Sequence, residues 1–300
     1  MDLPCEVVDV ALPWDLLHPK EGEAELRRAL ERERSAGHTD PSWAIEILTQ
    51  IARAESLQGK LREADRTLLE AEKLLPAAKS LAPKLRVLLE RGRALVLAKS
   101  PAQARERFME VLRLATEEVD LPYLIDAADM MARIETPKKR HEWTNRALEA
   151  AERTTITRAR NWRGVLYVRL GWHFLELLQL PKALEAFGQA ESAFREQGLA
   201  VHVILARSYA GRTLRLLNRI PEALELQKTL LTELDRQRLS DALINEEIAE
   251  CLQAMKKTDE AERYFAKAYE LHSADPLLSQ QDPMRLKRLK TLGKAKDQKA

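Results

Sequence analysis

The chain repeats a pattern of small and bulky residues about every forty positions. In each copy a small residue is followed twelve positions later by a second small slot, then by a bulky residue four further on and a small or apolar one three beyond. The copies are Ala52/Ala64/Leu68/Ala71, Gly92/Ala104/Phe108/Val111, Ala132/Thr144/Leu148/Ala151, Gly171/Ala183/Phe187/Ala190, Gly211/Ala223/Gln227/Leu230 and Ala249/Ala261/Phe265/Ala268. Their first members lie 40, 40, 39, 40 and 38 residues apart. Such a fixed period is typical of a stacked array of repeats.

The composition favours helices throughout. Leu, Ala, Glu, Arg and Lys dominate the 300 residues, whereas aromatic residues make up 5%, so we expect an all-α protein. The sequence has no apolar run long enough to span a bilayer and no secretory signal pattern, which predicts a cytoplasmic location. Cys5 and Cys251 are too far apart in sequence to indicate a disulfide framework or a zinc knuckle.

Helix start signals divide the chain into segments. We expect an extended N-terminal arm over 1–20, in which Trp14 and Leu16 pack on the first helices, and a capping helix within 21–40 (Glu23 to Arg34). Six helical pairs follow over 41–275. Pro or Ser/Thr at Ser100-Pro101, Thr136-Pro137, Pro181, Pro221 and Thr258-Asp259 marks the start of second helices, with Ser or Thr as caps. Residues 276–300 are expected to form a C-terminal capping helix, with Met284, Leu286 and Leu289 on its apolar side, and a basic tail.

The repeat resembles the tetratricopeptide repeat, in which Gly or Ala lies in the first helix and Ala, an aromatic residue and Ala lie in the second. The match covers roughly 41–273 and is best at Gly171–Ala190, where Phe174 also fits, and at Ala249–Ala268. The first-helix tryptophan is absent, and of the closing prolines only Pro76 is present. The resemblance implies a right-handed α-solenoid of long-period helical pairs that binds peptides or protein surfaces in a concave groove lined by the first helices.

Sequence motifs of catalysis are absent. The chain has no Gly-rich phosphate loop, no Gly-x-Ser-x-Gly and no His-Glu-x-x-His, and its histidines are scattered. We therefore predict a protein that is not an enzyme and that uses no cofactor and no metal ion.

One set of residues stands out as a candidate site. In the tetratricopeptide arrangement the residue after the first small position faces the groove, and these residues are Arg53, Arg93, Arg133, Trp172, Arg212 and Glu250. Arg169 and Arg215 lie one helical turn from this column. Guanidinium groups in a row could form bidentate contacts with carboxylates, so we predict a groove that binds a partner peptide or protein segment of acidic character.

Acidic residues complicate this prediction. Glu46, Asp126 and Asp129 occupy adjacent groove positions and could pair with the arginines, while Glu246, Glu247 and Glu250 would make the far end acidic. Small residues at the two recurring positions are expected to let the backbones of paired helices approach closely.

The C-terminal tail supplies an alternative. Residues 284–300 contain seven Lys or Arg and one Asp, which gives this tail +6 within a chain of net charge +2. Such a tail could bind nucleic acid or an anionic surface. The main prediction remains a non-catalytic adaptor or regulator that binds another protein; the sequence leaves its partner, its pathway and its oligomeric state open.

Overall fold

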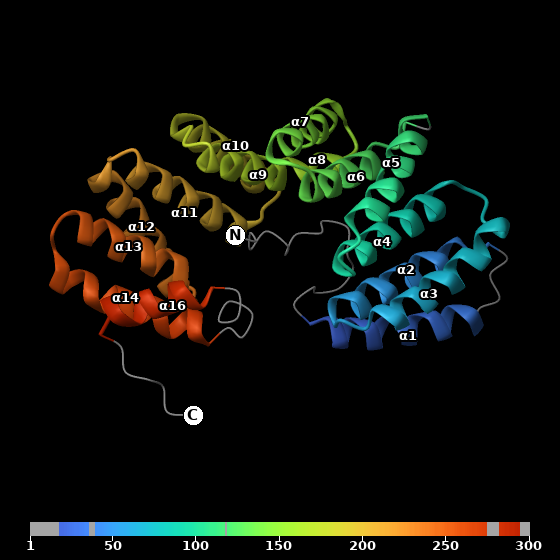
Figure 1. Ribbon diagram of the computed structural model, residues 1–300, viewed down its shortest axis with the longest axis horizontal. Coiled ribbons are helices and arrows are strands. Elements are labelled where there is room, and N and C mark those ends of the chain that lie inside the picture. The colour runs from blue at the N-terminus through green and yellow to red at the C-terminus, as the bar shows by residue number, and fades with distance from the viewer. Residues whose placement is uncertain (1–17, 36–39, 118, 275–281, 295–300) are drawn as a thin grey trace. The chain divides into compact units, whose positions relative to one another are not determined.

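The chain is built from helices that follow one another with short connections (Figure 1). A computed structural model describes residues 18–35, 40–117, 119–274 and 282–294, and within these ranges it contains no strand. The helices are α1 (Pro19–Ser35), α2 (Ser42–Leu57), α3 (Leu61–Leu74), α4 (Ala82–Leu97), α5 (Pro101–Glu117), α6 (Leu121–Ile134), α7 (Pro137–Arg153), α8 (Thr157–Arg160), α9 (Trp162–Glu176), α10 (Leu180–Glu196), α11 (Ala200–Leu216), α12 (Ile220–Arg236), α13 (Ala242–Ala254), α14 (Thr258–Ser273) and α16 (Pro283–Leu292). Nothing in the described part of the chain has both the length and the hydropathy that crossing a bilayer requires.

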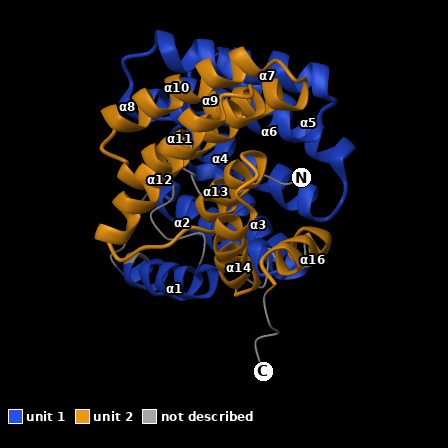
Figure 2. Cartoon of the chain, turned by 90° about the vertical axis from the view of Figure 1, so that its left-hand side faces the viewer, with its two compact units in different colours: residues 1–166 blue, residues 167–300 orange. Residues whose placement is uncertain are grey.

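The helices are arranged in consecutive pairs. Helix α2 packs on α3, α4 on α5, α6 on α7, α11 on α12 and α13 on α14, and first helices of successive pairs also touch, as α2 touches α4 and α11 touches α13. The chain divides into two compact units, residues 1–166 and 167–300, and the division falls within α9 (Figure 2).

Prolines begin many of these helices. Pro lies at the first or second position of α4, α6, α7, α10, α12 and α16, where its missing N–H costs no helical hydrogen bond. The expected cap at Thr136 is wrong, because its side chain accepts no hydrogen bond from the start of α7.

Both ends of the array differ in detail from expectation. Helix α1 begins at Pro19, so the extended arm does not reach residue 20; Trp14 and Leu16 lie outside the described residues. Leu26 and Leu30 are buried against α2, as their spacing indicated. At the other end α16 packs on α14 through the buried Leu289, but Met284 is 74% exposed and does not cover the last pair.

The recurring glycines accommodate large side chains. A Cβ atom on Gly92 or Gly171 would come within 3.0 Å of the ring of Phe108 or Phe187, and one on Gly211 would meet the side chain of Gln227. These contacts confirm that the paired helices meet at the glycines. They correct the reason, since each glycine makes room for a bulky side chain of the second helix rather than for its backbone.

Two polar residues occupy buried positions of the repeat pattern. Gln227 replaces the phenylalanine, and its amide donates a 2.8 Å hydrogen bond to the carbonyl oxygen of Ser208. The Thr144 hydroxyl donates to the carbonyl oxygen of Arg140 at 2.9 Å. The third and fifth pairs therefore tolerate departures from the pattern because each buried polar group has a partner.

Candidate functional site: the face of the first helices

The predicted arginines lie on the first helices of their pairs, on a surface that we call the A-helix face. Each unit has its own such face: the side chains of α2, α4 and α6 in unit 1, and those of α9, α11 and α13 in unit 2, at, and one or two turns from, the position after each recurring small residue. In the first unit these arginines are engaged in ion pairs. Arg93 is buried between Glu90 of its own helix and Asp126 of α6, and Arg53 Nη1 lies 3.4 Å from Glu90 Oε2. Arg133 is partly exposed, with Nε 3.4 Å from Asp129 Oδ2.

A further arginine of this face was missed by the sequence analysis. Arg86 on α4 is buried, with its Nε 3.1 Å from Glu46 Oε1 and its guanidinium 5.3 Å from the centre of the Tyr123 ring. Burial would lower the pKa of Arg86, but the nearby tyrosine and carboxylates raise it, so it stays charged. A signal was available: Glu46 and Arg86 are opposite charges 40 residues apart, which is one repeat period.

The A-helix face of the first unit is therefore balanced in charge. Its ion pairs join first helices of successive repeats: Glu46 to Arg86, Arg53 to Glu90 and Arg93 to Asp126. Removal of one partner would leave a buried charge uncompensated, so the pairs fix how neighbouring repeats stack. The expectation that acidic neighbours pair with the arginines is confirmed here.

In the second unit, arginines outnumber the carboxylates that they contact. Arg215 binds Glu247 of α13 through two hydrogen bonds, from Nε at 2.7 Å and Nη2 at 3.1 Å. Arg212 reaches the same carboxylate only at 3.6 Å, and 31% of its side chain is exposed. Two arginines thus share one carboxylate; Arg212 Nε is buried without a hydrogen-bond partner among the described residues, while other parts of the side chain are exposed.

Aromatic rings adjoin Arg212. Its guanidinium carbon lies 5.5 Å from the centre of the Trp172 ring, and Trp172 meets Tyr209 edge to face with 4.9 Å between ring centres. Phe187 lies beneath, 6.1 Å from Trp172. Trp172 is therefore held in one orientation by its neighbours, with a cation on its ring. Arg169, one turn earlier on α9, is half-buried.

The acidic end of the face is covered by α16. Arg285 donates to Glu246 from Nε at 2.9 Å, and Arg288 pairs with Glu250 and lies 3.8 Å from Glu246. Burial would raise the pKa of Glu246, but the nearby His272 ring and the Arg285 guanidinium lower it to about 2. Glu250, predicted as a groove residue, is thus neutralised by the C-terminal helix.

These pairs also occupy part of the basic tail. Lys294 binds Glu262 of α14 at 2.6 Å, so Arg285, Arg288 and Lys294 all have carboxylate partners. Residues 295–300 lie outside the described residues. The charges of the tail therefore serve, in part, to attach α16 to the last helical pair.

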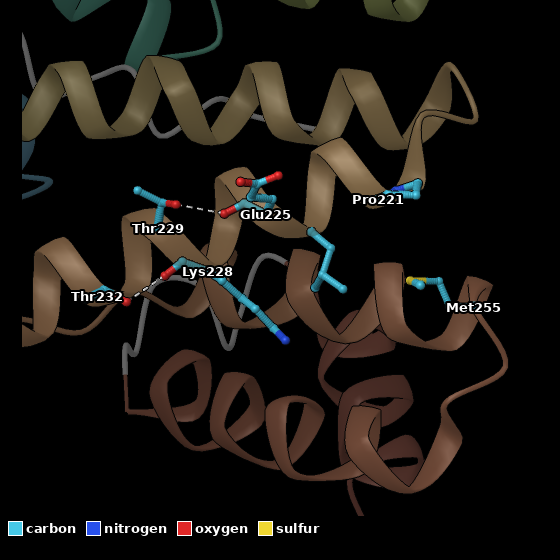
Figure 3. Close-up of a pocket in the computed structure, with 7 residues that line it drawn as sticks. Pro221, Glu225, Lys228, Thr229, Thr232 and Met255 are labelled. Atoms are coloured by element: carbon cyan, nitrogen blue, oxygen red, sulfur yellow. Dashed lines mark hydrogen bonds between the residues drawn. The ribbon is translucent and has the colours of Figure 1, made fainter.

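Two hollows in the described part of the surface lie away from the predicted site residues. One, of about 430 Å³, follows a face of α12 and ends at Met255; the hydroxyls of Thr229 and Thr232 donate to carbonyl oxygens of their own helix at 2.9 Å (Figure 3). Another, of about 590 Å³, lies over α3, α4 and α5 beside Arg91. Neither contains a residue of the predicted site.

In the described ranges no group of three His, Cys, Asp or Glu side chains is placed to hold a metal ion.

Comparisons identify the fold. No model of a known protein family matches the sequence, and no curated protein matches it. A signal transduction ATPase with numerous domains and a tetratricopeptide repeat sensor, from Pyrococcus horikoshii, has a similar structure, with a TM-score of 0.64, 15% identity and coverage of 91% of this chain and 45% of that one. The present chain thus spans less than half the length of that protein.

Two smaller proteins match over most of their length. NprR in complex with its cognate peptide NprX has a TM-score of 0.53 and 16% identity, with 92% of this chain and 80% of NprR covered. A tetratricopeptide repeat protein from Parabacteroides merdae has a TM-score of 0.50 and 15% identity, with 92% of each chain covered. The present chain therefore has the tetratricopeptide-type fold, an all-α solenoid of helical pairs.

Proposed function

We propose that the protein is a non-catalytic cytoplasmic scaffold that binds an acidic segment of a partner protein on the A-helix face of its second unit. The observation that carries this proposal is the arrangement of Arg212 over Trp172 beside a carboxylate that Arg215 already holds. A partner carboxylate would pair with the exposed part of the Arg212 guanidinium, whose own contact with Glu247 is only 3.6 Å, and an adjacent apolar side chain would pack on Trp172. Arg169 and Arg215 flank this centre.

The other predicted arginines have a supporting role in this proposal. Arg53 and Arg93 keep the first helices of unit 1 in register through their ion pairs with Glu90 and Asp126. Arg133 pairs with Asp129 of its own helix and is the partly exposed arginine of this unit that would contact a ligand. The peptide complex of NprR supports the proposal because it is a chain of the same fold with a bound peptide. The alternative function is polyanion binding by the tail. It gains no support from Arg285, Arg288 and Lys294, because these residues are paired with carboxylates of the chain.

A peptide display library tests this function. Selection on the full chain should enrich peptides with Asp or Glu next to an aliphatic or aromatic residue. The affinity of the enriched peptides should fall at least tenfold in Arg212→Glu, equivalent to about 1.4 kcal/mol, and in Trp172→Ala. Arg236→Glu, which changes an exposed arginine of α12 in the same unit, is the matched control and should bind normally.

Two results would count against the proposal. One is enrichment without an acidic pattern, and the other is unchanged affinity in Arg212→Glu. A steep, log-linear loss of binding with salt would instead indicate a polyanion ligand.

A further inference from the structure

A strained and exposed apolar residue lies at the start of α6. Val119 has φ of +57° and its side chain is 71% exposed. The turns about two and three periods later carry Gly198 and Arg238 in the same left-handed conformation. A β-branched residue is disfavoured there, and an exposed valine gains nothing from the interior that would offset the strain. Val119 is therefore an exposed aliphatic side chain that is open to contact with a partner.

An additional helix adjoins this turn. The connection between α7 and α9 contains α8, which packs on α6 and α7. Residues 153–166 contain four arginines and no Asp or Glu, and Ile156, directly before α8, is 46% exposed. The connection between α3 and α4 contains only a three-residue 3₁₀ helix, Leu75–Ala77, so in the described part of the chain α8 is the one α-helix inserted between two pairs.

Arg158 links α8 to the strained turn. Its guanidinium lies 5.6 Å from the centre of the buried Tyr123 ring, and Asp120, the residue after Val119, is close enough to attract its charge. Val119, Ile156 and Arg158 therefore belong to one edge of unit 1.

The arginines of this edge differ from those of the A-helix face. Arg153, Arg158 and Arg160 are exposed, and none of them forms an ion pair with a carboxylate of the described residues. Arg53, Arg86 and Arg93 all do. The α8 edge thus presents exposed positive charge that forms no ion pair within the described residues, apart from the attraction of Asp120 for Arg158.

We propose that the α8 edge, formed by Val119, Ile156, Arg153, Arg158 and Arg160, is a second docking surface that binds an acidic and apolar segment of a partner protein. Carboxylates of that segment would pair with the arginines, and its aliphatic side chains would cover Val119 and Ile156. The exposed aliphatic side chains of Val119 and Ile156 favour a protein segment, which offers aliphatic as well as acidic side chains, over a nucleic acid.

The test uses a full chain in which the site of the proposed function is disabled. Peptide display on the Arg212→Glu variant should still enrich acidic and aliphatic peptides. Adding Arg158→Glu and Arg160→Glu should weaken the selected peptides at least tenfold. Arg62→Glu on α3, another exposed arginine of unit 1, is the matched control and should leave their affinity unchanged.

Val119→Gly separates binding from folding. It should raise the melting temperature, because glycine adopts positive φ without strain, and it should still lower peptide affinity severalfold, because the apolar contact is lost. A purely structural valine would show only the gain in stability. Failure to enrich acidic peptides, normal binding by the double charge reversal, or tighter binding of a single-stranded oligonucleotide than of the peptides would overturn the proposal. Because Arg212 is already reversed, none of these outcomes depends on the site of the proposed function.

Discussion

Gly171 on α9 lies directly against the ring of Phe187 on α10, so that even a Cβ atom at Gly171 would overlap the ring. Gly171→Leu should therefore lower the free energy of unfolding by about 3 kcal/mol, because Phe187 is fully buried and cannot move aside. Urea denaturation measures this change.

The neighbouring Gly188 supplies the control for that experiment. Nothing lies within 4 Å of a Cβ at Gly188, although it is adjacent to Phe187 in the sequence. Gly188→Ala should raise the free energy of unfolding by about 0.5 to 1 kcal/mol, since alanine is the better helix former. Equal losses in the two variants would contradict the packing argument.

Arg93 and Arg133 should respond differently to the same substitution. Arg93→Met leaves the buried carboxylates of Glu90 and Asp126 without their shared partner and should destabilise the chain by about 3 kcal/mol. Arg133→Met should cost less than Arg93→Met, because a single buried carboxylate, Asp129, loses a 3.4 Å partner that is itself partly exposed. Thermal unfolding of the two variants decides the matter, and a small effect at Arg93 would show that its ion pairs contribute little.

The sequence predicted the helical pairs because their signals are local and repeated. Prolines at helix starts, and small residues opposite bulky ones, recur with the period and need no knowledge of the tertiary structure. Whether an arginine is exposed or held in an ion pair depends on carboxylates 33 to 40 positions away, as for Arg93 with Asp126 and Arg86 with Glu46. The adjacent groove positions of Glu46, Asp126 and Asp129 indicated that they could pair with arginines, but which arginine each one contacts depends on how successive repeats pack.

Helix α8 and the residues in the left-handed conformation could not be predicted from local sequence signals. Val119 and Leu178 adopt positive φ although neither is Gly or Asn, because tertiary packing sets the turn and overrides local preference. A sequence rule based on glycine identifies Gly59 and Gly198 and misses both.

Leu178 offers a simple test of that strain. It has φ of +55°, its side chain is 79% exposed, and it ends α9 just before α10 begins. Leu178→Gly should raise the free energy of unfolding by about 1 kcal/mol, because the strain is relieved and little burial is lost. Leu177→Gly, at the preceding residue without positive φ, should lower it. A loss of stability in Leu178→Gly would mean that its side chain is required by the fold.

Glu246 should make the attachment of α16 sensitive to acid. Its pKa is about 2 in the folded chain and about 4.5 when its partners are absent, so its contribution is complete above pH 4.5 and disappears as the pH falls towards 2. A shift of this size corresponds to about 3 kcal/mol.

The free energy of unfolding of the wild type should therefore fall more steeply between pH 4.5 and pH 2 than that of Glu246→Gln. Glu225→Gln, at an exposed position of α12, should retain the wild-type slope. Parallel curves for the wild type and Glu246→Gln, measured by urea denaturation across this range, would show that the contacts with Arg285 and His272 do not hold the carboxylate in its charged form.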